Sequence, residues 1–284
     1  MKYAYYPGCT QETTAKEYNQ SVQEICEVLG IELKEVPGWT CCGASSAHST
    51  DYWLTHALAG RNLALAEKQG LDIAVACPAC YLRLNSTRHE VLANADLKEK
   101  LPSLIQMPYA ARGEIRHVLD IICHSVGLEA LRKNVSQPLS GLKLAAYYGC
   151  YLVRPRELTH FDDPENPQSL DELLKALGSD VRDWRGKVEC CGGSLSFTGR
   201  EAVRQMVGGI IEAALEVDAE AIVCACPLCQ ANLETRQSGP KPLPVFYFSE
   251  LVALAFGLKT ERWLRRHLIS PLALLKEHQL LPGK

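Results

Sequence analysis

The spacing of the cysteines constrains this chain more than any other feature of its sequence. Ten of the 13 cysteines form two copies of one pattern, in which a single cysteine is followed by an adjacent pair and then by a Cys-Pro-x-Cys motif. The separation between pair and motif is 35 positions in both copies, from 42 to 77 and from 191 to 226. The two sets are Cys9, Cys41, Cys42, Cys77 and Cys80, and then Cys150, Cys190, Cys191, Cys226 and Cys229. The chain is therefore an internal duplication.

The residues that flank the cysteines repeat as well, and they locate the join between the copies. Glycine precedes Cys9 and Cys150 and follows both adjacent pairs. The second copy is longer between its first cysteine and its pair, 40 positions (150 to 190) against 32 (9 to 41), and the acidic, proline-containing residues 162–167 in that interval are typical of a surface loop. The polar stretch 134–141 precedes an apolar run, so we expect two domains, residues 1–137 and 138–284.

The composition argues against several classes of protein. The chain has 284 residues, of which 47% are apolar and 22% charged, and its net charge of -3 is not that of a nucleic-acid-binding surface. Its longest apolar runs, such as residues 251–256, are far shorter than the roughly 18 to 20 residues that span a bilayer. The N-terminus has no apolar signal core. We therefore expect a cytoplasmic protein with no membrane span and no nucleic-acid partner, whose cysteines serve metal binding or redox chemistry and not a disulfide framework.

The hydrophobic pattern alternates between strands and helices. Short apolar runs either end at Gly-Cys or lead into a Cys-Pro-x-Cys motif, and these expected strands are residues 3–6, 71–76, 142–148 and 219–225. Helical stretches lie between them, at residues 14–29, 51–69, 169–177 and 200–217. We expect an α/β fold with a small parallel sheet and flanking helices in each half. Ligands of such sheets gather beyond the carboxyl ends of the strands, where all ten cysteines fall.

Five cysteines in each copy exceed what most metal sites need. A structural zinc ion is closed by four ligands, so a set of five with two adjacent members overfills it. A disulfide between Cys41 and Cys42 would close a strained small ring and leave the other three unexplained. An iron–sulfur cluster uses several thiolates at once, and the glycines after each pair allow the backbone to approach it closely. The pattern favours an iron–sulfur site over zinc, although the compact cysteine run of ferredoxins is absent.

The doubled pattern of Cys, Cys-Cys-Gly and Cys-Pro-x-Cys resembles the cysteine-rich CCG domain, and two copies in a chain of this length resemble the B-type subunit of heterodisulfide reductase. The resemblance covers nearly the whole chain. It implies two CCG domains that arose by duplication and are related by pseudo-twofold symmetry. It also implies that each domain holds one noncubane four-iron four-sulfur ([4Fe-4S]) cluster with all five of its cysteines as ligands, so that the ten cysteines bind two clusters.

The same resemblance implies an activity and partners. In relatives, a small disulfide enters between the two clusters and is cleaved to two thiols by stepwise one-electron transfers, so this chain resembles a thiol–disulfide oxidoreductase subunit that is active within a complex. The chain has no Gly-x-Gly-x-x-Gly fingerprint after a strand, so its electrons must come from elsewhere. The resemblance implies that they come from a ferredoxin-like iron–sulfur subunit, the C-type member of such complexes, which is fed by a flavoprotein, the A-type member.

A function of another class is the alternative, namely a noncatalytic electron-transfer subunit of a quinone-linked dehydrogenase such as a succinate dehydrogenase or glycolate oxidase that carries the same domain. One position differs from some relatives that reduce a heterodisulfide. They carry a histidine directly after the first cysteine of the second copy, where this chain has Tyr151. A phenol with a pKa of about 10 is a poorer proton source near neutrality than an imidazole. The identity of the disulfide and the direction of the reaction therefore stay open.

Cleavage of a disulfide between the clusters requires a pocket between the two copies. Its walls would be the segments after the first cysteine and after the pair in each copy, where the polar candidates are Thr10, His48, Tyr151 and Ser194. Tyr151 and His48 are the candidate catalytic residues, since either side chain can donate a proton. A loop histidine with satisfied hydrogen bonds is the alternative for His48.

The remaining candidates have structural alternatives. Arg154 and Arg156 follow Cys150 and have the charge to neutralise an anionic substrate, or they are solvated surface charges. Cys26, Cys123 and Cys224 lie outside the repeat, and we expect them to be small core residues. An apolar tail continues beyond the second repeat and either caps its own core or docks the partner protein. Its members are Trp263, Leu264, His267, Leu268, Ile269, Leu272, Leu274 and Leu275.

Overall fold

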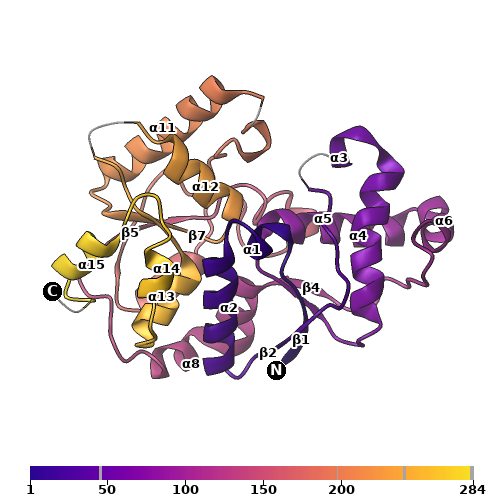
Figure 1. Cartoon of the computed structure of the whole chain (residues 1–284), viewed down its shortest axis with the longest axis horizontal. Helices are drawn as coiled ribbons and strands as arrows, with labels where there is room; N and C mark the ends of the chain where they lie inside the picture. Colours follow the sequence, from indigo (N-terminus) through magenta and orange to yellow (C-terminus); the bar gives the residue numbers. More distant parts are fainter. Residues whose placement is uncertain (45–46, 197, 239–240, 282–284) are drawn as a thin grey trace.

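The computed structural model describes residues 1–44, 47–196, 198–238 and 241–281, and these form two four-stranded sheets in which every strand pair is parallel. The first sheet has the order β2 (Glu32–Glu35), β1 (Lys2–Tyr6), β3 (Ile73–Val75) and β4 (Ile115–His117). The second has the order β6 (Asp180–Arg182), β5 (Lys143–Tyr147), β7 (Ala221–Cys224) and β8 (Val245–Tyr247). The two halves thus repeat one topology, which confirms the predicted α/β duplication (Figure 1).

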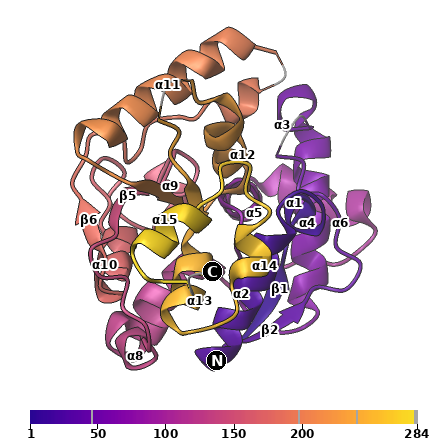
Figure 2. The same ribbon diagram turned by 60° about the vertical axis from the view of Figure 1, so that its left-hand side comes forward.

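Helices flank both sheets (Figures 1 and 2). Those of the first half are α1 (Cys9–Glu12), α2 (Lys16–Val28), α3 (Ala47–Thr50), α4 (Tyr52–Glu67), α5 (Pro78–Ala93), α6 (Ala95–Ile105), α7 (Val118–Asp120), a π-helical turn η1 (Ile121–Gly127) and α8 (Leu128–Lys133). Those of the second half are α9 (Arg156–Thr159), α10 (Ser169–Ala176), a 3₁₀ turn η2 (Gly193–Leu195), α11 (Arg200–Glu216), α12 (Pro227–Arg236), α13 (Phe248–Ala255), α14 (Glu261–Leu264) and α15 (Leu272–Glu277). None of the described helices is both long and apolar enough to cross a membrane.

The predicted elements agree with the structure to within a few residues, and the loop at 162–167 has no helix or strand, as predicted. The central strands are β1, β3, β5 and β7, whose residues are almost all buried because each has a neighbour on both sides and helices over the sheet. Segment 134–141, where we expect the domains to join, lies between α8 and β5 and contains no helix or strand.

The C-terminal tail packs on the first half of the chain. Trp263 is fully buried, and its indole N–H donates to Gln20 of α2 at 3.0 Å. Arg266 forms an ion pair of 2.6 Å with Glu17, also of α2, and α2 lies beside α13 and α14 in Figures 1 and 2. Much of the tail therefore closes the junction between the halves, while Leu268 remains 71% exposed.

Candidate functional site

The ten repeated cysteines lie where the central strands end. Cys9 and Cys150 follow β1 and β5 after a two-residue turn. Cys77 and Cys226 follow β3 and β7 and are the N-cap residues of α5 and α12. Proline takes the first position of both helices, where no backbone N–H is needed, so that the next cysteine of each motif falls in the first turn. Parallel pairing of the central strands brings all these positions to one edge of each sheet.

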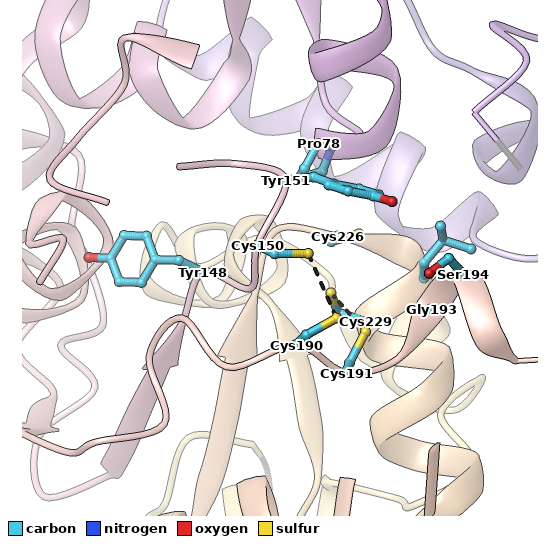
Figure 3. A pocket seen from close by; sticks show the side chains of 11 residues that line it. Pro78, Tyr148, Cys150, Tyr151, Cys190, Cys191, Gly193, Ser194, Cys226 and Cys229 are labelled. Carbon is cyan, nitrogen blue, oxygen red and sulfur yellow. Dashed lines mark hydrogen bonds between the residues drawn. The ribbon is translucent and has the colours of Figure 1, made fainter. Parts of the chain in front are cut away.

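Within each half the thiols form two close pairs, and the separations match between halves. The first cysteine lies opposite the first member of the adjacent pair, and the second member lies opposite the last cysteine of the motif (Figure 3 shows the second set). The Sγ–Sγ distances are 3.9 Å for Cys9 and Cys41, 3.3 Å for Cys42 and Cys80, 4.0 Å for Cys150 and Cys190, and 3.4 Å for Cys191 and Cys229. The duplication has therefore preserved the arrangement of the thiols as well as their spacing in the sequence.

The glycine before the first cysteine of each set is required by this crowding. Gly8 and Gly149 both have positive φ, +80° and +66°. A Cβ atom on Gly8 would lie 2.9 Å from Sγ of Cys80, and one on Gly149 would lie 3.2 Å from Sγ of Cys229. Any larger residue would displace a thiol, so only glycine lets the backbone approach sulfur this closely at both positions.

Backbone amides point at sulfur in equivalent places. The N–H of Gly43 donates to Sγ of Cys41 at 3.4 Å, and the N–H of Gly192 donates to Sγ of Cys190 at 3.4 Å. The Cys42 and Cys9 thiols, together with the N–H of Gly43, lower the pKa of Cys41 to about 2. The Cys150 thiol and the N–H of Gly192 lower the pKa of Cys190 to about 6. The first member of each adjacent pair is thus held ready to be a thiolate, the form that binds metal, and the Cys229 thiol lowers the pKa of Cys191 as well.

Tyrosines fix the segments that carry the adjacent pairs. Tyr6 and Tyr147 occupy the same place in the two repeats, three residues before the first cysteine. The hydroxyl of Tyr6 donates to the carbonyl oxygen of Thr40 at 2.7 Å, and that of Tyr147 donates to the carbonyl oxygen of Glu189 at 2.6 Å. Thr40 and Glu189 directly precede the pairs, so each tyrosine ties the end of a central strand to its pair.

The two sets approach each other at the junction between the halves. The pKa of Cys77 lies well below its ordinary value, mainly because of the Cys226 thiol and then because of the Cys80 thiol. The pKa of Cys226 is raised instead, because the Cys77 thiol and burial outweigh the lowering by Cys229. Both thiols are buried, so each set extends from a buried cysteine at the junction toward the outer cysteines.

A cavity lies against the second set and is closed from the side of the first half by Pro78 (Figure 3). Besides the five cysteines of this set, Tyr148, Tyr151, Gly193, Ser194 and Leu228 line it. Of the four predicted polar residues, Tyr151 and Ser194 are therefore brought together, whereas Thr10 and His48 do not line this cavity. Burial, followed by the Cys150 thiol, raises the pKa of Tyr151, so its phenol keeps its proton near neutrality.

His48 lies apart, on the short helix α3. Its Nδ1 atom is buried without a hydrogen-bond partner among the described residues, and its Nε2 atom lies 3.3 Å from the hydroxyl of Ser49. The arginines are engaged elsewhere or exposed. Arg154 pairs with Glu165 at 2.8 Å in the predicted loop, and Arg156 is exposed at the start of α9. Both arginines are therefore charges at the protein surface, and neither lines the cavity.

The three cysteines outside the repeat are buried, with exposures of 1% for Cys26, 8% for Cys123 and 0% for Cys224. Asn232, which sequence inspection missed, contacts the second set directly. Its amide donates to the carbonyl oxygen of Cys191 at 2.9 Å, and its carbonyl oxygen accepts from Ser196 at 2.9 Å. The signal in the sequence is its place three residues after Cys229, one helical turn along α12.

The donor set fits an iron–sulfur cluster in each half. All five candidate ligands of each half are thiols, one backbone N–H group in each half donates to sulfur, and the glycines leave room for close approach of the backbone. In the described part of the chain, no group of three or more Cys, His, Asp or Glu side chains is arranged to hold one metal ion.

Comparison with known proteins agrees with this geometry. The model of the cysteine-rich domain named CCG matches residues 3–85 and 144–234. The chain belongs to the CCG family. The two matches correspond to the two halves, and each contains one complete set of five cysteines.

Relatives of this CCG protein are similar over nearly their whole length. A protein of Wolinella succinogenes named 8-methylmenaquinol:fumarate reductase membrane anchor subunit is 35% identical, with 90% of this chain and 93% of the relative covered. A protein of Archaeoglobus profundus, named for its likeness to the B-type subunit of heterodisulfide reductase, is 32% identical, with 92% and 93% covered. The B-type subunit of the ferredoxin/F(420)H(2)-dependent CoB-CoM heterodisulfide reductase of Methanosarcina acetivorans is 27% identical, with 92% and 91% covered. These similarities support a redox subunit of an oxidoreductase complex.

One solved structure has the same fold. The crystal structure of a hypothetical protein from Helicobacter pylori aligns with a TM-score of 0.72 at 12% identity over 94% of this chain. The chain spans about half (51%) of that protein.

Proposed function

We propose that this chain is the iron–sulfur subunit of a heterodisulfide reductase-like complex, in which a small disulfide is cleaved or formed between two noncubane [4Fe-4S] clusters. Cys9, Cys41, Cys42, Cys77 and Cys80 would hold one cluster, and Cys150, Cys190, Cys191, Cys226 and Cys229 the other. When bound, such clusters supply electrons one at a time, and two of them suit the two-electron cleavage of a disulfide bond.

The observation that carries this proposal is the approach of the two equivalent sets at the junction. Cys77 and Cys226 face each other there, and Pro78 of the first half closes the cavity beside the second set. A single electron-carrying site would not need two equivalent thiol sets that meet at one junction. A disulfide has two equivalent ends, and a duplicated protein offers an equivalent site to each of them.

The chain's own residues would bind the substrate and donate hydrogen bonds to it. Tyr151 and Ser194 line the cavity, and both hydroxyls can donate a hydrogen bond to a substrate sulfur. The phenol of Tyr151 is neutral near pH 7, as any phenol with a pKa of about 10 or higher is, and burial raises its pKa further, so it would act on a departing thiolate mainly as a hydrogen-bond donor. Leu228 and Pro78 make the rest of the wall largely apolar and limit the access of water.

Electrons would reach the chain from other proteins of the complex in the cytoplasm. The sequence has no nucleotide-binding fingerprint, so we propose that the direct donor is a ferredoxin-like iron–sulfur subunit, with a flavoprotein behind it. The names of the relatives support the coarser point that the chain has partner subunits, since each relative is part of a larger reductase or is similar to such a part.

A second candidate function is electron transfer in a quinone-linked dehydrogenase. The observation that favours it is the 35% identity to the fumarate reductase subunit of Wolinella succinogenes over 90% of this chain. In that case the chain would pass electrons between partner subunits and would not act on a disulfide.

One experiment separates the two functions. We would measure viologen-driven reduction of a panel of disulfides by the anaerobically purified wild type and by Cys41→Ser, Cys190→Ser and Tyr151→Phe. We expect wild-type activity, an almost complete loss in either cysteine variant, because both sets act on one disulfide, and an intermediate loss in Tyr151→Phe. Substantial activity in either cysteine variant contradicts the paired mechanism. A wild type that is loaded with iron but inactive on every disulfide supports the quinone-linked role.

A further inference from the structure

Tyr18 of α2 is the point at which one side chain contacts both halves of the site. Its hydroxyl lies 2.9 Å from the carbonyl oxygen of Ala76 and 2.9 Å from the carbonyl oxygen of Ala225. These two residues are equivalent in the repeats, because each directly precedes the first cysteine of a Cys-Pro-x-Cys motif. One phenol therefore bridges the segments that deliver Cys77 and Cys226.

The ring of Tyr18 is held in place by the second half of the chain. It is fully buried and stacks on Tyr247 with a centroid separation of 4.3 Å and an interplanar angle of 9°. The edge of Phe248 contacts it at a centroid separation of 6.1 Å. One turn further along α2, the hydroxyl of Ser21 lies 2.6 Å from that of Ser249. These contacts hold the ring, and with it the hydroxyl, against the second half.

We propose that Tyr18 is a positioning residue that fixes the two cysteine sets relative to each other and sets the reduction potentials of both clusters together. The first part stands on the hydrogen bonds alone, and the second part rests on the proposed function, since it requires bound clusters. The single hydroxyl hydrogen is shared between the two carbonyl oxygens and places partial positive charge between the two sets. Positive charge there stabilises the reduced, more negative state of each cluster, so its removal makes both potentials more negative.

The surroundings predict that the two halves respond unequally. The carbonyl oxygen of Ala76 also lies 2.7 Å from Nε2 of His117, so it keeps a second donor when the phenol is removed. For Ala225, Tyr18 is the only donor among the described side chains. The larger change is therefore expected in the second half.

The test compares Tyr18→Phe with Tyr5→Phe. Tyr5 is also a fully buried tyrosine, but its hydroxyl donates only within the first half, to Gln11 and Asn19, both at 2.8 Å. In the iron-free chain, we would measure amide hydrogen exchange of peptides that cover residues 73–80 and 222–229. In the anaerobic iron-loaded chain, we would measure the iron content and both midpoint potentials by redox titration with electron paramagnetic resonance.

We expect Tyr18→Phe to exchange faster in both peptides, about three- to tenfold, as for the loss of one net hydrogen bond, and more in residues 222–229. The iron content should match wild type while both potentials become more negative. Tyr5→Phe should leave residues 222–229 unchanged and should not shift both potentials. Faster exchange in one peptide alone, or in neither, contradicts the bridging role. Unchanged potentials at full iron content contradict the electrostatic part, whereas a wild type without iron contradicts the proposed function and leaves the exchange result to decide on the bridge.

Discussion

The two halves hold the same thiols in different surroundings. Both sets have the same internal pairs, the same glycine contacts and the same tyrosine bond to the residue before the adjacent pair. In the first set, however, Cys9 and Cys41 are exposed, whereas Cys150 and Cys190 of the second set are half-buried beside a cavity. The duplication has thus kept the ligand geometry while it allowed access to the two sites to diverge.

The halves also differ in the charge of their buried groups. In the first half, burial lowers the pKa of His56 and that of His117, the latter to about 4, so both rings are neutral near pH 7. In the second half, His267 lies between Glu234 and Glu250 at 3.0 and 2.9 Å, and the carboxylates keep it charged. A buried pair of Lys187 with Asp171, 2.9 Å apart, adds to these charges. The stability of the two halves should therefore depend on pH in opposite ways.

The largest expected effect is on iron content. Wild type should bind about eight irons per chain, four in each of two clusters. Cys42→Ser and Cys191→Ser should each reduce this to about four, because each ligand set comes from one half only. Iron analysis with electron paramagnetic resonance of the reduced protein checks this. Loss of all iron in one variant would show that the two sites do not assemble independently.

The different exposure of the two cysteine sets predicts different rates of iron removal. A chelator should remove iron from the first site, with its exposed Cys9 and Cys41, several-fold faster than from the enclosed second site. The matched pair of variants identifies the sites, since Cys191→Ser retains only the fast phase and Cys42→Ser only the slow one. Equal rates in both variants would mean that exposure of the outer thiols does not control access.

The elements that sequence inspection found are those with a local signal. The central strands are apolar runs followed by Gly-Cys or Cys-Pro, and buried parallel strands have this composition. Strand β2 (Glu32–Glu35) was missed because an edge strand with three exposed residues reads as polar sequence. Helices α5 and α12 were missed because apolar residues occupy no single stripe when a helix is buried on several sides.

The candidate ligands were likewise predictable from the sequence, whereas the residues that contact them from the other half of the chain were not. Cysteine spacing and flanking glycines are visible in the sequence itself, so the ten thiols and their gathering at the strand ends could be inferred. Tyr18 and Pro78 contact the other half of the chain, Tyr18 across 207 positions to Ala225. No periodicity or motif encodes a contact at that separation. Because Thr10 and His48 are local neighbours of the first set, they were expected at a cavity that the fold builds beside the second.

The next effect is the alkaline loss of stability, which tests the charged second half. Although burial lowers the pKa of His267, Glu250 and Glu234 raise it to about 10, whereas it is about 6.5 in the unfolded chain. The folded state therefore binds the extra proton between these values, and the free energy of unfolding falls as pH rises through that window, by up to about 4 to 5 kcal/mol. Urea unfolding as a function of pH measures this. His267→Gln should remove the alkaline slope, and a slope that persists in this variant must come from other groups.

The smallest expected effect is a loss of stability at acid pH, which tests the buried neutral histidine of the first half. Burial is the main cause of the low pKa of His117, and the ring lies against the carbonyl oxygen of Ala76. The unfolded chain binds a proton from about pH 6.5 downward, while the folded state resists it until about pH 4. Stability is therefore complete above pH 6.5 and falls by up to about 3 kcal/mol as the pH drops to 4.

His117→Gln separates this effect from general acid unfolding. Glutamine can donate to the Ala76 carbonyl as the imidazole does, but it does not titrate, so the variant should lose the acid slope while keeping much of its stability at pH 7. Amide exchange at pH 5 should then slow in β4 of the variant relative to wild type and stay unchanged in β8, its counterpart in the second sheet. An equal change in both strands would mean that the halves open as one unit, and the contrast between a neutral and a charged half would have no separate consequence for stability.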